Sequence, residues 1–292
     1  MLGQVNIFKD LDNNSGKVLG EHLGFKDKNC VFFGVGGLGE PVLRALLLMG
    51  AKVLVSRRSE DKLEKMLTEY QGFAASPAHL ISKAADVTKQ ESVDEVCALA
   101  QDRFGSVDLV VFFPGSIVKG ANVAHGESPT KADTSAILQQ IDADYLGGIR
   151  IIKGLEPLLK KSHEKGERPR IVLIDSIGAG RAGGSPQSAS VGYNAAKVSL
   201  RNFAQMLAVD WAKWCSINTI APGPVLTDLN RERMGHDAPR GKRAISNTPA
   251  GEYIKFDDPV GATLFLLSPV LGSGVIAQTV MVDNGLTNAA PY

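Results

Sequence analysis

The sequence predicts a single α/β domain built on a doubly wound, mostly parallel sheet. Short apolar runs alternate along the chain with segments of helical periodicity, and the connections between them are short. Continuously apolar runs are typical of strands in a parallel sheet, which is buried on both faces. Strands and helices that alternate in this way form right-handed crossovers. Six runs show the pattern: Cys30–Phe33, Val53–Val55, Val107–Phe113, Ile171–Ile174, Ile217–Ala221 and Thr279–Val282.

The segments between these runs carry apolar residues at helical spacing. Residues 63–70 follow an i, i+3, i+4, i+7 pattern, and residues 93–104 repeat it behind Thr88-x-x-Glu91, which predicts a capping box. The longest segment, 133–160, keeps apolar residues on one face throughout. Gly147–Gly148 lies in its middle and lowers helix stability, so we expect a second helix to approach closely there.

Composition and charge exclude several classes of protein. The chain has 292 residues, with 32 Lys and Arg against 31 Asp and Glu, a formal net charge of +1. This near-neutrality argues against a surface built for nucleic acid or anionic lipid. The most apolar stretch, 31–55, is interrupted by charged residues and a proline, so we expect no membrane span. The five histidines lack ligand spacing, so we expect no metal site.

The cysteines indicate a reducing compartment. Cys30, Cys97 and Cys215 are far apart and form no CxxC motif, which excludes a disulfide scaffold. The first residues include acidic side chains and lack an apolar segment, so they match neither a signal peptide nor a transit peptide. We therefore expect a cytoplasmic protein.

One domain is expected, covering residues 29–292, with residues 1–28 as an extension packed on its surface. Two stretches, 178–190 and 230–255, are predicted to be functional loops, because long loops in compact domains usually are. The second belongs to a lid at about 224–256 and carries six Lys and Arg against three Asp and Glu. Such a lid suits a carboxylate, a phosphate or an acyl carrier, and its charges equally suit a solvated face.

A glycine motif follows the first apolar run. It reads Gly34-x-Gly36-x-x-Gly39, with Gly37 and Leu38 in the same turn, and an apolar helical segment begins after it. In this context glycine lets the backbone turn sharply and approach a pyrophosphate, whose charge lies at the helix N-terminus. The motif therefore predicts a dinucleotide site.

Two arginines follow the second run and bear on the choice of nucleotide. An NAD-dependent protein would place an acidic residue there to accept from the ribose 2′-OH, but this chain has Arg57 and Arg58. Because guanidinium groups pair well with a 2′-phosphate, the arginines favour NADP(H). Their alternative role is that of solvated charges before a helix capped by Ser59.

A phenol and an ammonium form the third signal. Tyr193 and Lys197 lie four residues apart in a segment of helical periodicity, so their side chains share one face. A nearby cation favours the phenolate form, which suits a general acid for a carbonyl oxygen. Ser176 follows the run 171–174, at the sheet edge where ligands of such folds bind.

Taken together, these features resemble the short-chain dehydrogenase/reductase family over about residues 29–287. The resemblance implies a single Rossmann domain with a seven-stranded sheet and helices on both faces, a small carbonyl or alcohol substrate, and a homotetramer. It is carried by the glycine turn at 34–39, Asp86-Val87-Thr88, Asp108–Gly115, Ser176, Tyr193 with Lys197, Asn218–Gly223 with Thr227, and Val282–Gly285.

The resemblance also implies a role for each site residue. Tyr193 exchanges a proton with the substrate oxygen, Lys197 tunes it and bonds the nicotinamide ribose, and Ser176 polarises the carbonyl. Asp86 meets the adenine and Thr227 the nicotinamide carboxamide or the pyrophosphate, while both equally suit caps of local structure. The remaining cofactor contacts are Val87, Gly115, Pro222, Gly223 and Val225.

Some segments depart from the family pattern. Phe33 precedes a glycine motif with a tighter first gap, and Phe112–Gly115 replaces a tetrad that usually offers two side-chain amides. Ser176 and Tyr193 are 17 positions apart, more than the family spacing, and the extra length in 181–190 is expected to border the substrate.

A further departure is Asp144, which stands at the position of the family's catalytic Asn. Its backbone carbonyl would support the proton relay, and its carboxylate would add charge near Lys197. The leading hypothesis is an NADPH-dependent carbonyl reductase, or an alcohol dehydrogenase in reverse. The alternative is a non-catalytic dinucleotide-binding sensor, which Asp144 and the altered tetrad favour and the phenol–ammonium pair opposes. A third option, a dehalogenase-like relative, is disfavoured, because such a protein would lack the cofactor glycines and normally the lysine, which this chain retains.

Overall fold

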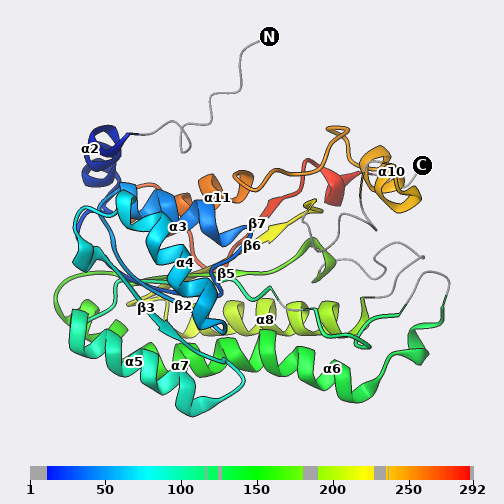
Figure 1. Cartoon of the computed structure of the whole chain (residues 1–292), viewed down its shortest axis with the longest axis horizontal. Helices are drawn as coiled ribbons and strands as arrows, with labels where there is room; N and C mark the ends of the chain where they lie inside the picture. The colour runs from blue at the N-terminus through cyan, green and yellow to red at the C-terminus, as the bar shows by residue number, and fades with distance from the viewer. Residues whose placement is uncertain are drawn as a thin grey trace, which may run out of the picture.

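The centre of the computed structural model is a seven-stranded sheet in the order β3-β2-β1-β4-β5-β6-β7 (Figure 1). Every neighbouring pair of strands is parallel, so the predicted doubly wound sheet is confirmed. The structure describes residues 12–115, 117–123, 127–179, 190–226, 235 and 237–289. The strands are β1 (Asn29–Phe33), β2 (Lys52–Arg57), β3 (Leu80–Ala84), β4 (Leu109–Phe112), β5 (Arg170–Ile174), β6 (Ser216–Pro222) and β7 (Thr279–Val282).

The strand β3 is the one that no apolar run predicts. Its sequence is Leu-Ile-Ser-Lys-Ala, and only Leu80 is buried. Because β3 lies at the edge of the sheet, it has a single neighbour and needs no continuous apolar run. The other six strands match the predicted runs to within two residues at each end.

Helices cover both faces of the sheet, as predicted, and each face has its own apolar core. One face carries α3 (Gly39–Leu48), α4 (Glu60–Tyr70) and α11 (Asp258–Leu267). The other carries α5 (Gln90–Phe104), α7 (Gly147–Glu164) and α8 (Val191–Asp210). The remaining described helices are α2 (Asn13–Leu23), α6 (Thr134–Ile141), α10 (Pro239–Ser246) and short 3₁₀ turns at Gln71–Phe73, Pro77–His79, Pro129–Lys131, Ile177–Ala179 and Leu286–Asn288.

The predicted capping box at the start of α5 is wrong. The helix begins one residue before Glu91, and its N-cap residue is Lys89, whose side chain makes no capping bond. Thr88 instead donates to the carboxylate of Asp86, two residues earlier. An Asp that follows a strand captures a nearby hydroxyl more readily than the helix terminus does.

The predicted long helix is present, with a π turn at Asp142–Leu146 between α6 and α7. The close approach predicted at its two glycines is confirmed. A Cβ at Gly148 would lie 2.9 Å from the Leu200 side chain of α8, and a Cβ at Gly147 would lie 2.9 Å from Val87. Glycine here lets the long helix sit directly on α8 and on the turn after β3.

Helix α2 is not predicted by apolar periodicity, because only Leu19 and Leu23 pack against the core and its closest contacts are made by glycines. A Cβ at Gly16 or Gly20 would collide with the backbone at the end of α3. The helix is capped by Asp12 and ends at Gly24, which has a left-handed φ of 76°. Ser268 donates to the carbonyl of Leu23 at 2.8 Å, so α2 is fixed to the end of the sheet opposite the candidate site.

Candidate active site

The candidate site residues gather at one edge of the sheet, where the strands end. In a doubly wound sheet, ligands bind outside the carboxyl ends of the strands, at the point where the strand order reverses. Here that point lies between β1 and β4, whose last paired residues are Phe33 and Phe112. The parallel register brings the segments that follow the first six strands to this same edge.

Aromatic rings support the glycine turn after β1. Gly34 has a φ of 79°, and a Cβ there would collide with the backbone oxygen of Phe113, so only glycine fits. A Cβ at Gly39 would lie 3.1 Å from the ring of Phe32, which packs edge-to-face on Phe113 at a centroid distance of 5.4 Å. The apolar tetrad that departs from the family pattern therefore supports the turn by packing.

The other side of the turn is open. Within the described residues, a Cβ at Gly36 would meet only the Arg57 guanidinium, at 3.7 Å, and a Cβ at Gly115 would meet nothing within 4 Å. Gly37 is exposed with a φ of 46°, and Leu38 packs partly against the core. Since α3 begins at the next residue, this open space lies at a helix N-terminus, where a phosphate group binds favourably.

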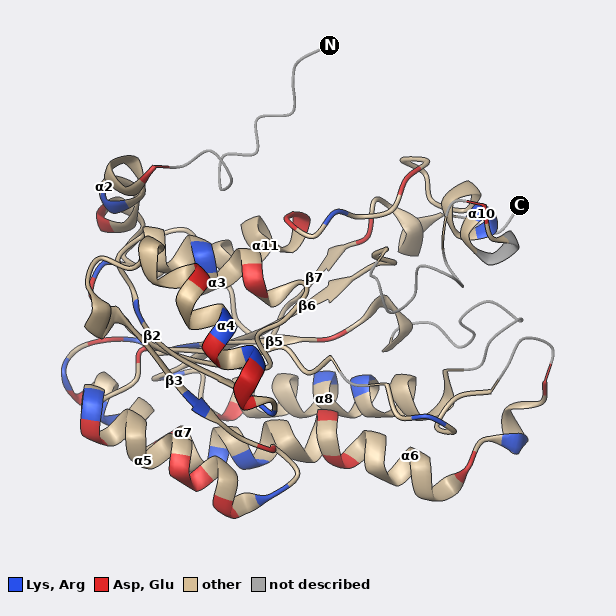
Figure 2. Ribbon diagram, in the orientation of Figure 1, with Lys and Arg blue, Asp and Glu red and all other residues tan. Residues whose placement is uncertain are grey.

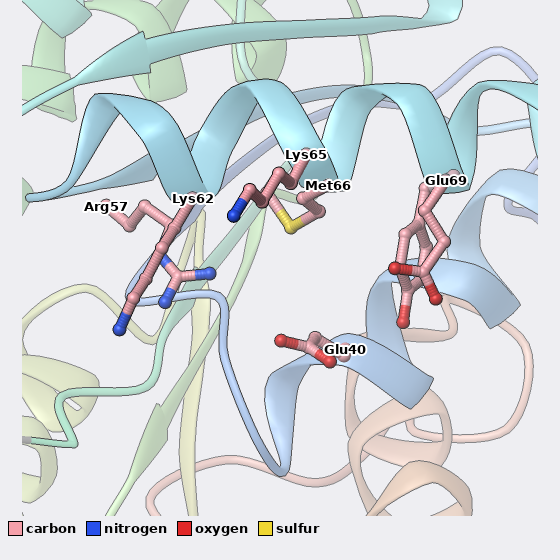
Figure 3. Close-up of a pocket in the computed structure, with 7 residues that line it drawn as sticks. Glu40, Arg57, Lys62, Lys65, Met66 and Glu69 are labelled. Atoms are coloured by element: carbon pink, nitrogen blue, oxygen red, sulfur yellow. The ribbon is translucent and has the colours of Figure 1, made fainter.

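A pocket of about 250 Å³ lies beside Arg57, between α3 and α4 (Figure 3). Arg57, Lys62 and Lys65 stand toward one end of it, and Glu40 and Glu69 stand at the other. The sequence analysis missed Lys62 and Lys65, although their three-residue spacing on α4 places both on one face. Figure 2 shows the same mixture of signs along α4.

The charges around this pocket influence one another. Burial raises the pKa of Glu40 above its usual value, Glu69 adds to the rise, and the Arg57 guanidinium opposes it. Arg58 is exposed and lies on the side of Asp86, whose pKa its charge helps to lower. The two arginines therefore face different acidic groups.

The turn after β3 is built around Asp86. Its Oδ1 accepts hydrogen bonds from the backbone N–H and the hydroxyl of Thr88, at 3.0 and 2.8 Å. Its own N–H donates to the Ser92 hydroxyl at 3.0 Å. Burial raises the pKa of Asp86, but the bonds from Thr88 outweigh it and hold the pKa below its usual value. The carboxylate thus has a local structural role at the position expected for adenine.

Tyr193 and Lys197 lie one turn apart on α8, as their spacing predicts. The Lys197 Nζ lies 5.5 Å from the centre of the Tyr193 ring. It donates to the backbone oxygens of Pro114 at 3.2 Å and Ile174 at 3.3 Å, which link it to the ends of β4 and β5. The lysine side chain is only 1% exposed, whereas the tyrosine is half-buried. The phenol therefore lies next to a fixed cation.

Asp144 lies in the π turn and pairs with this lysine. Its Oδ2 is 3.6 Å from the Lys197 Nζ, and the Asp144 side chain is fully buried. A π turn inserts one residue into the helical repeat and is frequent at functional sites. Because both partners are buried, loss of either would leave an uncompensated charge.

Ser176 follows β5, and the residue before it, Asp175, is part of a buried ion pair. Its Oγ accepts a hydrogen bond from the backbone N–H of Gly178 at 3.1 Å. The preceding Asp175 pairs through Oδ2 with the Nε of Arg201 on α8. Burial raises the pKa of Asp175 above its usual value, and it outweighs the Arg201 guanidinium, the Ser176 N–H and the Lys197 ammonium, which all lower it. The sequence analysis missed both members of this pair.

The described part of the segment after β6 is fixed at the same edge of the sheet. The Gly223 N–H donates to the Val282 oxygen at 2.8 Å, which fixes the turn after Pro222 against β7. Val225 forms a parallel bridge with Ile254, so the two ends of the expected lid lie together. Thr227 lies outside the described residues, as does most of the expected substrate loop, residues 180–189.

The described part of the chain holds no cluster of three His, Cys, Asp or Glu side chains arranged as metal ligands. None of the helices in that part is long and apolar enough to cross a membrane.

Comparisons with known proteins match nearly the whole domain. A family model described as enoyl-(acyl carrier protein) reductase matches residues 34–287. The NADH-dependent L-xylulose reductase of Ambrosiozyma monospora is 25% identical, over 87% of this chain and 92% of that protein. The gluconate 5-dehydrogenase of Gluconobacter oxydans is 28% identical, over 86% and 91%. A solved actinorhodin polyketide ketoreductase with NADPH has a TM-score of 0.76 and 22% identity, over 90% of this chain and 98% of that chain.

The matched region begins in the glycine turn and ends after β7, and so contains every segment of the candidate site. The relatives are dehydrogenases and reductases of alcohol and carbonyl groups. The chain therefore belongs to the short-chain dehydrogenase/reductase family and is an NAD(P)-dependent oxidoreductase that acts on CH–OH and C=O groups.

Proposed function

We propose that this protein reduces a keto group to an alcohol with NADPH, reversibly, through Ser176, Tyr193 and Lys197. The observation that carries the proposal is the pair on α8, a half-buried phenol one helical turn from a buried, fixed ammonium. A protein that only bound a dinucleotide would need no such pair. General acid catalysis needs a proton donor held beside a group that stabilises the charge it leaves behind.

The segments around the glycine turn fit a dinucleotide. Within 4 Å of an added Cβ, Gly36 would meet only Arg57 among the described side chains and Gly115 would meet none, and the N-terminal dipole of α3 points toward this space. When bound, the cofactor supplies the hydride, while the protein supplies orientation and charge. The residues proposed to hold it are Gly34, Gly36, Gly37, Leu38, Gly39, Asp86, Val87, Gly115, Tyr193, Lys197, Pro222, Gly223, Val225 and Thr227, with Arg57 and Arg58 at the adenosine ribose.

Each side chain at the reacting end has one task. Tyr193 donates its phenolic proton to the substrate oxygen during reduction and takes it back during oxidation. The Ser176 hydroxyl donates a hydrogen bond to the same oxygen and polarises the carbonyl. Lys197 stabilises the phenolate and bonds the ribose hydroxyls. Asp144 balances the positive charge of Lys197, so this buried pair carries no net charge before Tyr193 gives up its proton.

NADP(H) is proposed over NAD(H) because of the cations beside the ribose position. Arg57 lies against the glycine turn, and Lys62 and Lys65 line the adjoining pocket. A 2′-phosphate gains charge-assisted hydrogen bonds in such a setting. The relatives do not decide the choice, since one is named as NADH-dependent and another was solved with NADPH.

One observation favours the second candidate function, that of a non-catalytic NAD(P)-binding sensor. The Lys197 charge is already matched by Asp144, which stands where the family has an uncharged Asn. A neutralised lysine stabilises a phenolate less than a free one would. We rank this function second because Tyr193 and Ser176 are both retained.

A cytoplasmic homotetramer is proposed as the assembled form. The exposed apolar side chains suit the two-fold interfaces that a tetramer needs. Light scattering at micromolar concentration tests this, and a monomeric mass would contradict it. The free cysteines suit the reducing cytoplasm. The exposed apolar side chains include Leu138, Leu146, Val198, Met206 and Val209, together with Val270, Leu271 and Met281.

The experiment that tests the function follows NADPH oxidation against a panel of carbonyl compounds. The panel contains a ketose, a keto sugar acid, a cyclic diketone and a 3-oxoacyl thioester. The matched variant is Tyr193→Phe, whose ring still packs but carries no proton to donate. We expect its turnover to fall about 10²–10⁴-fold while NADPH affinity stays within about twofold.

Two results would contradict the proposal. A Tyr193→Phe variant that kept more than half the wild-type rate would remove the tyrosine from the reaction. A wild-type protein that bound NADPH tightly but reduced no member of the panel would favour the sensor.

A further inference from the structure

Helix α8 contacts Ile174, the last residue of β5, and the two residues that follow it, Asp175 and Ser176. Tyr193, Lys197 and Arg201 recur every four residues along one face of the helix. Lys197 donates to the carbonyl of Ile174, the last residue of β5. Arg201, one turn further along, reaches the two residues that follow.

The Arg201 guanidinium makes both of these contacts at once. Its Nε pairs with Oδ2 of Asp175, and its Nη2 donates to the backbone oxygen of Ser176 at 3.1 Å. The Asp175 side chain is fully buried, whereas that of Arg201 is 15% exposed. The Asp175 backbone N–H donates to the Ile220 oxygen of β6 at 2.8 Å, so the backbone that carries this carboxylate is anchored to the sheet.

Ser176 depends on such support because it lies beyond the strand. Strand β5 ends at Ile174, and within the described residues the pairing of β5 with β6 does not extend to Ser176. Its Oγ accepts from Gly178, in a short 3₁₀ turn that leads out of the described residues. The direction of the hydroxyl therefore depends on how its own backbone is fixed.

We propose that Arg201 and Asp175 form a positioning pair that holds the Ser176 hydroxyl in line with Tyr193. The inference rests on the proposed function, because it assigns the pair to the carbonyl-polarising serine. Arg201 binds the Ser176 carbonyl on one side, and Asp175 fixes the guanidinium on the other. Since Lys197 and Arg201 extend from the same helix, the proton donor and the serine share one rigid support.

A purely structural ion pair would behave differently from a positioning pair. Buried pairs often add little net stability, and their replacement by apolar residues can be neutral. Any effect of replacing a purely structural pair would be confined to the midpoint of thermal unfolding, and the kinetics of the folded enzyme would not change. A positioning pair changes turnover, because misplacement of a reacting group by about 1 Å can cost about a hundredfold in rate.

The chain offers a matched control at the other end of the same two elements. Arg168 precedes β5 and donates from Nη2 to the carbonyl of Ala212, just beyond α8. It too is a half-buried arginine that joins β5 to α8 through a backbone oxygen. It lies far from the carboxyl edge of the sheet. Arg168→Met therefore removes an equivalent link with no effect on Ser176.

The test compares Arg201→Met and Arg168→Met in the full chain, with NADPH and a substrate from the carbonyl panel. We expect Arg201→Met to lower kcat about ten- to a hundredfold while NADPH affinity stays within about twofold. The deuterium isotope effect on hydride transfer should rise, because the chemical step becomes slower. Arg201→Lys, which keeps the charge but loses the fork, should recover part of the rate. Arg168→Met should keep kcat within about twofold even where its thermal midpoint falls.

A crystal structure of Arg201→Met gives a readout that needs no activity. We expect the Ser176 Oγ to move by about 1 Å or more while Tyr193 and Lys197 stay in place. Wild-type kcat and an unmoved serine in Arg201→Met would overturn the proposal. If that variant does not fold, Arg201→Lys against Arg168→Lys decides by the same two measurements. A wild-type enzyme that reduces no substrate defeats the proposed function instead, and the position of Ser176 still tests the pair.

Discussion

Two groups of charged side chains flank the candidate site, and they are held in opposite ways. Lys197 of α8 and Asp144 of the π turn are both buried, and the Lys197 ammonium also donates to two backbone carbonyls. Beside α4, Arg57 and its charged neighbours line an open pocket of about 250 Å³, in which both acidic and basic groups are present (Figure 3). The first group is enclosed by protein, whereas the second is open to solvent.

This difference indicates what each group can do. A buried charge cannot turn to water, so removing its partner leaves the full cost of desolvation and affects both rate and stability. An exposed charge is screened and can reorient, so its removal costs little folding stability and mainly affects what binds beside it. We infer that the buried group controls whether the reaction occurs, and that the exposed group controls which nucleotide is preferred.

The largest expected effect comes from the buried lysine. In Lys197→Met the stem still packs, but no ammonium lies beside Tyr193 and the carbonyls of β4 and β5 lose their donor. We expect the turnover to fall by about a hundredfold or more, together with weaker NADPH binding. Steady-state kinetics and calorimetric titration measure the two effects. The comparison breaks if Lys197→Met keeps wild-type turnover, because the buried group would then be structural only.

A second prediction tests the buried carboxylate. Asp144→Asn leaves the Lys197 ammonium without its anion, which favours the phenolate of Tyr193. Reduction needs the protonated phenol, so its rate should decline at a lower pH than in the wild type, while the reverse oxidation should extend to lower pH. The loss of unfolding free energy should stay below the roughly 3–5 kcal/mol typical of a broken buried pair, because the Asn oxygen still accepts.

The control for Asp144→Asn is Asp142→Asn, in the same π turn. Asp142 pairs with Arg150 at 2.7 Å, but both side chains are partly exposed. Its substitution should leave the pH profile unchanged. Coincident profiles for Asp144→Asn and the wild type would show that Asp144 does not reach the reacting groups.

Most of the fold could be predicted because the five central strands are buried on both faces. Such burial requires apolar runs, and all five carry them, as does the edge strand β7. The exceptions have physical reasons. The edge strand β3 buries only Leu80, and the closest contacts of α2 are made by Gly16 and Gly20, which have no side chain for periodicity to detect.

The site could be predicted wherever its residues are neighbours in sequence. Tyr193 and Lys197 are four positions apart, and a helix suffices to bring them together. Asp175 and Arg201 are 26 positions apart and meet only because α8 packs back along β5. The family resemblance identifies the position of Asp144, but its pairing with Lys197 depends on the π turn, which no pattern in the sequence predicts.

The exposed group supports a third prediction, on nucleotide choice. We expect NADP(H) to bind at least about tenfold more tightly than NAD(H), since charge-assisted hydrogen bonds contribute about 1.5–3 kcal/mol each and tenfold needs only about 1.4. Arg57→Asp should reverse the preference by repelling the phosphate and accepting from the 2′-OH. Calorimetric titration of both nucleotides into both proteins measures this. Equal wild-type affinities, or an unchanged ratio in the variant, would show that the arginines are a solvated edge.

The smallest effect is expected at the acidic end of the pocket. Burial raises the pKa of Glu40, so the folded protein holds this proton more tightly than the unfolded chain. Its contribution to stability is therefore greatest at low pH and is lost as the pH rises through the raised value. Above that value the ionised carboxylate also competes with a 2′-phosphate for Arg57. Both effects should vanish in Glu40→Gln.

We expect Glu40→Gln to bind NADP(H) about two- to fivefold more tightly at neutral pH, as befits a partly exposed charge pair, with NAD(H) binding unchanged. The gain should shrink as salt is added, because the ions screen the carboxylate from the phosphate. Glu69→Gln is the matched control, since Glu69 lines the same pocket but is more exposed, and it should gain less. A gain that persists in high salt, or one that is equal for both nucleotides, would mean that Glu40 acts on the glycine turn through its packing. The distinction between a fixed buried group and a screened exposed one would then fail at this pocket.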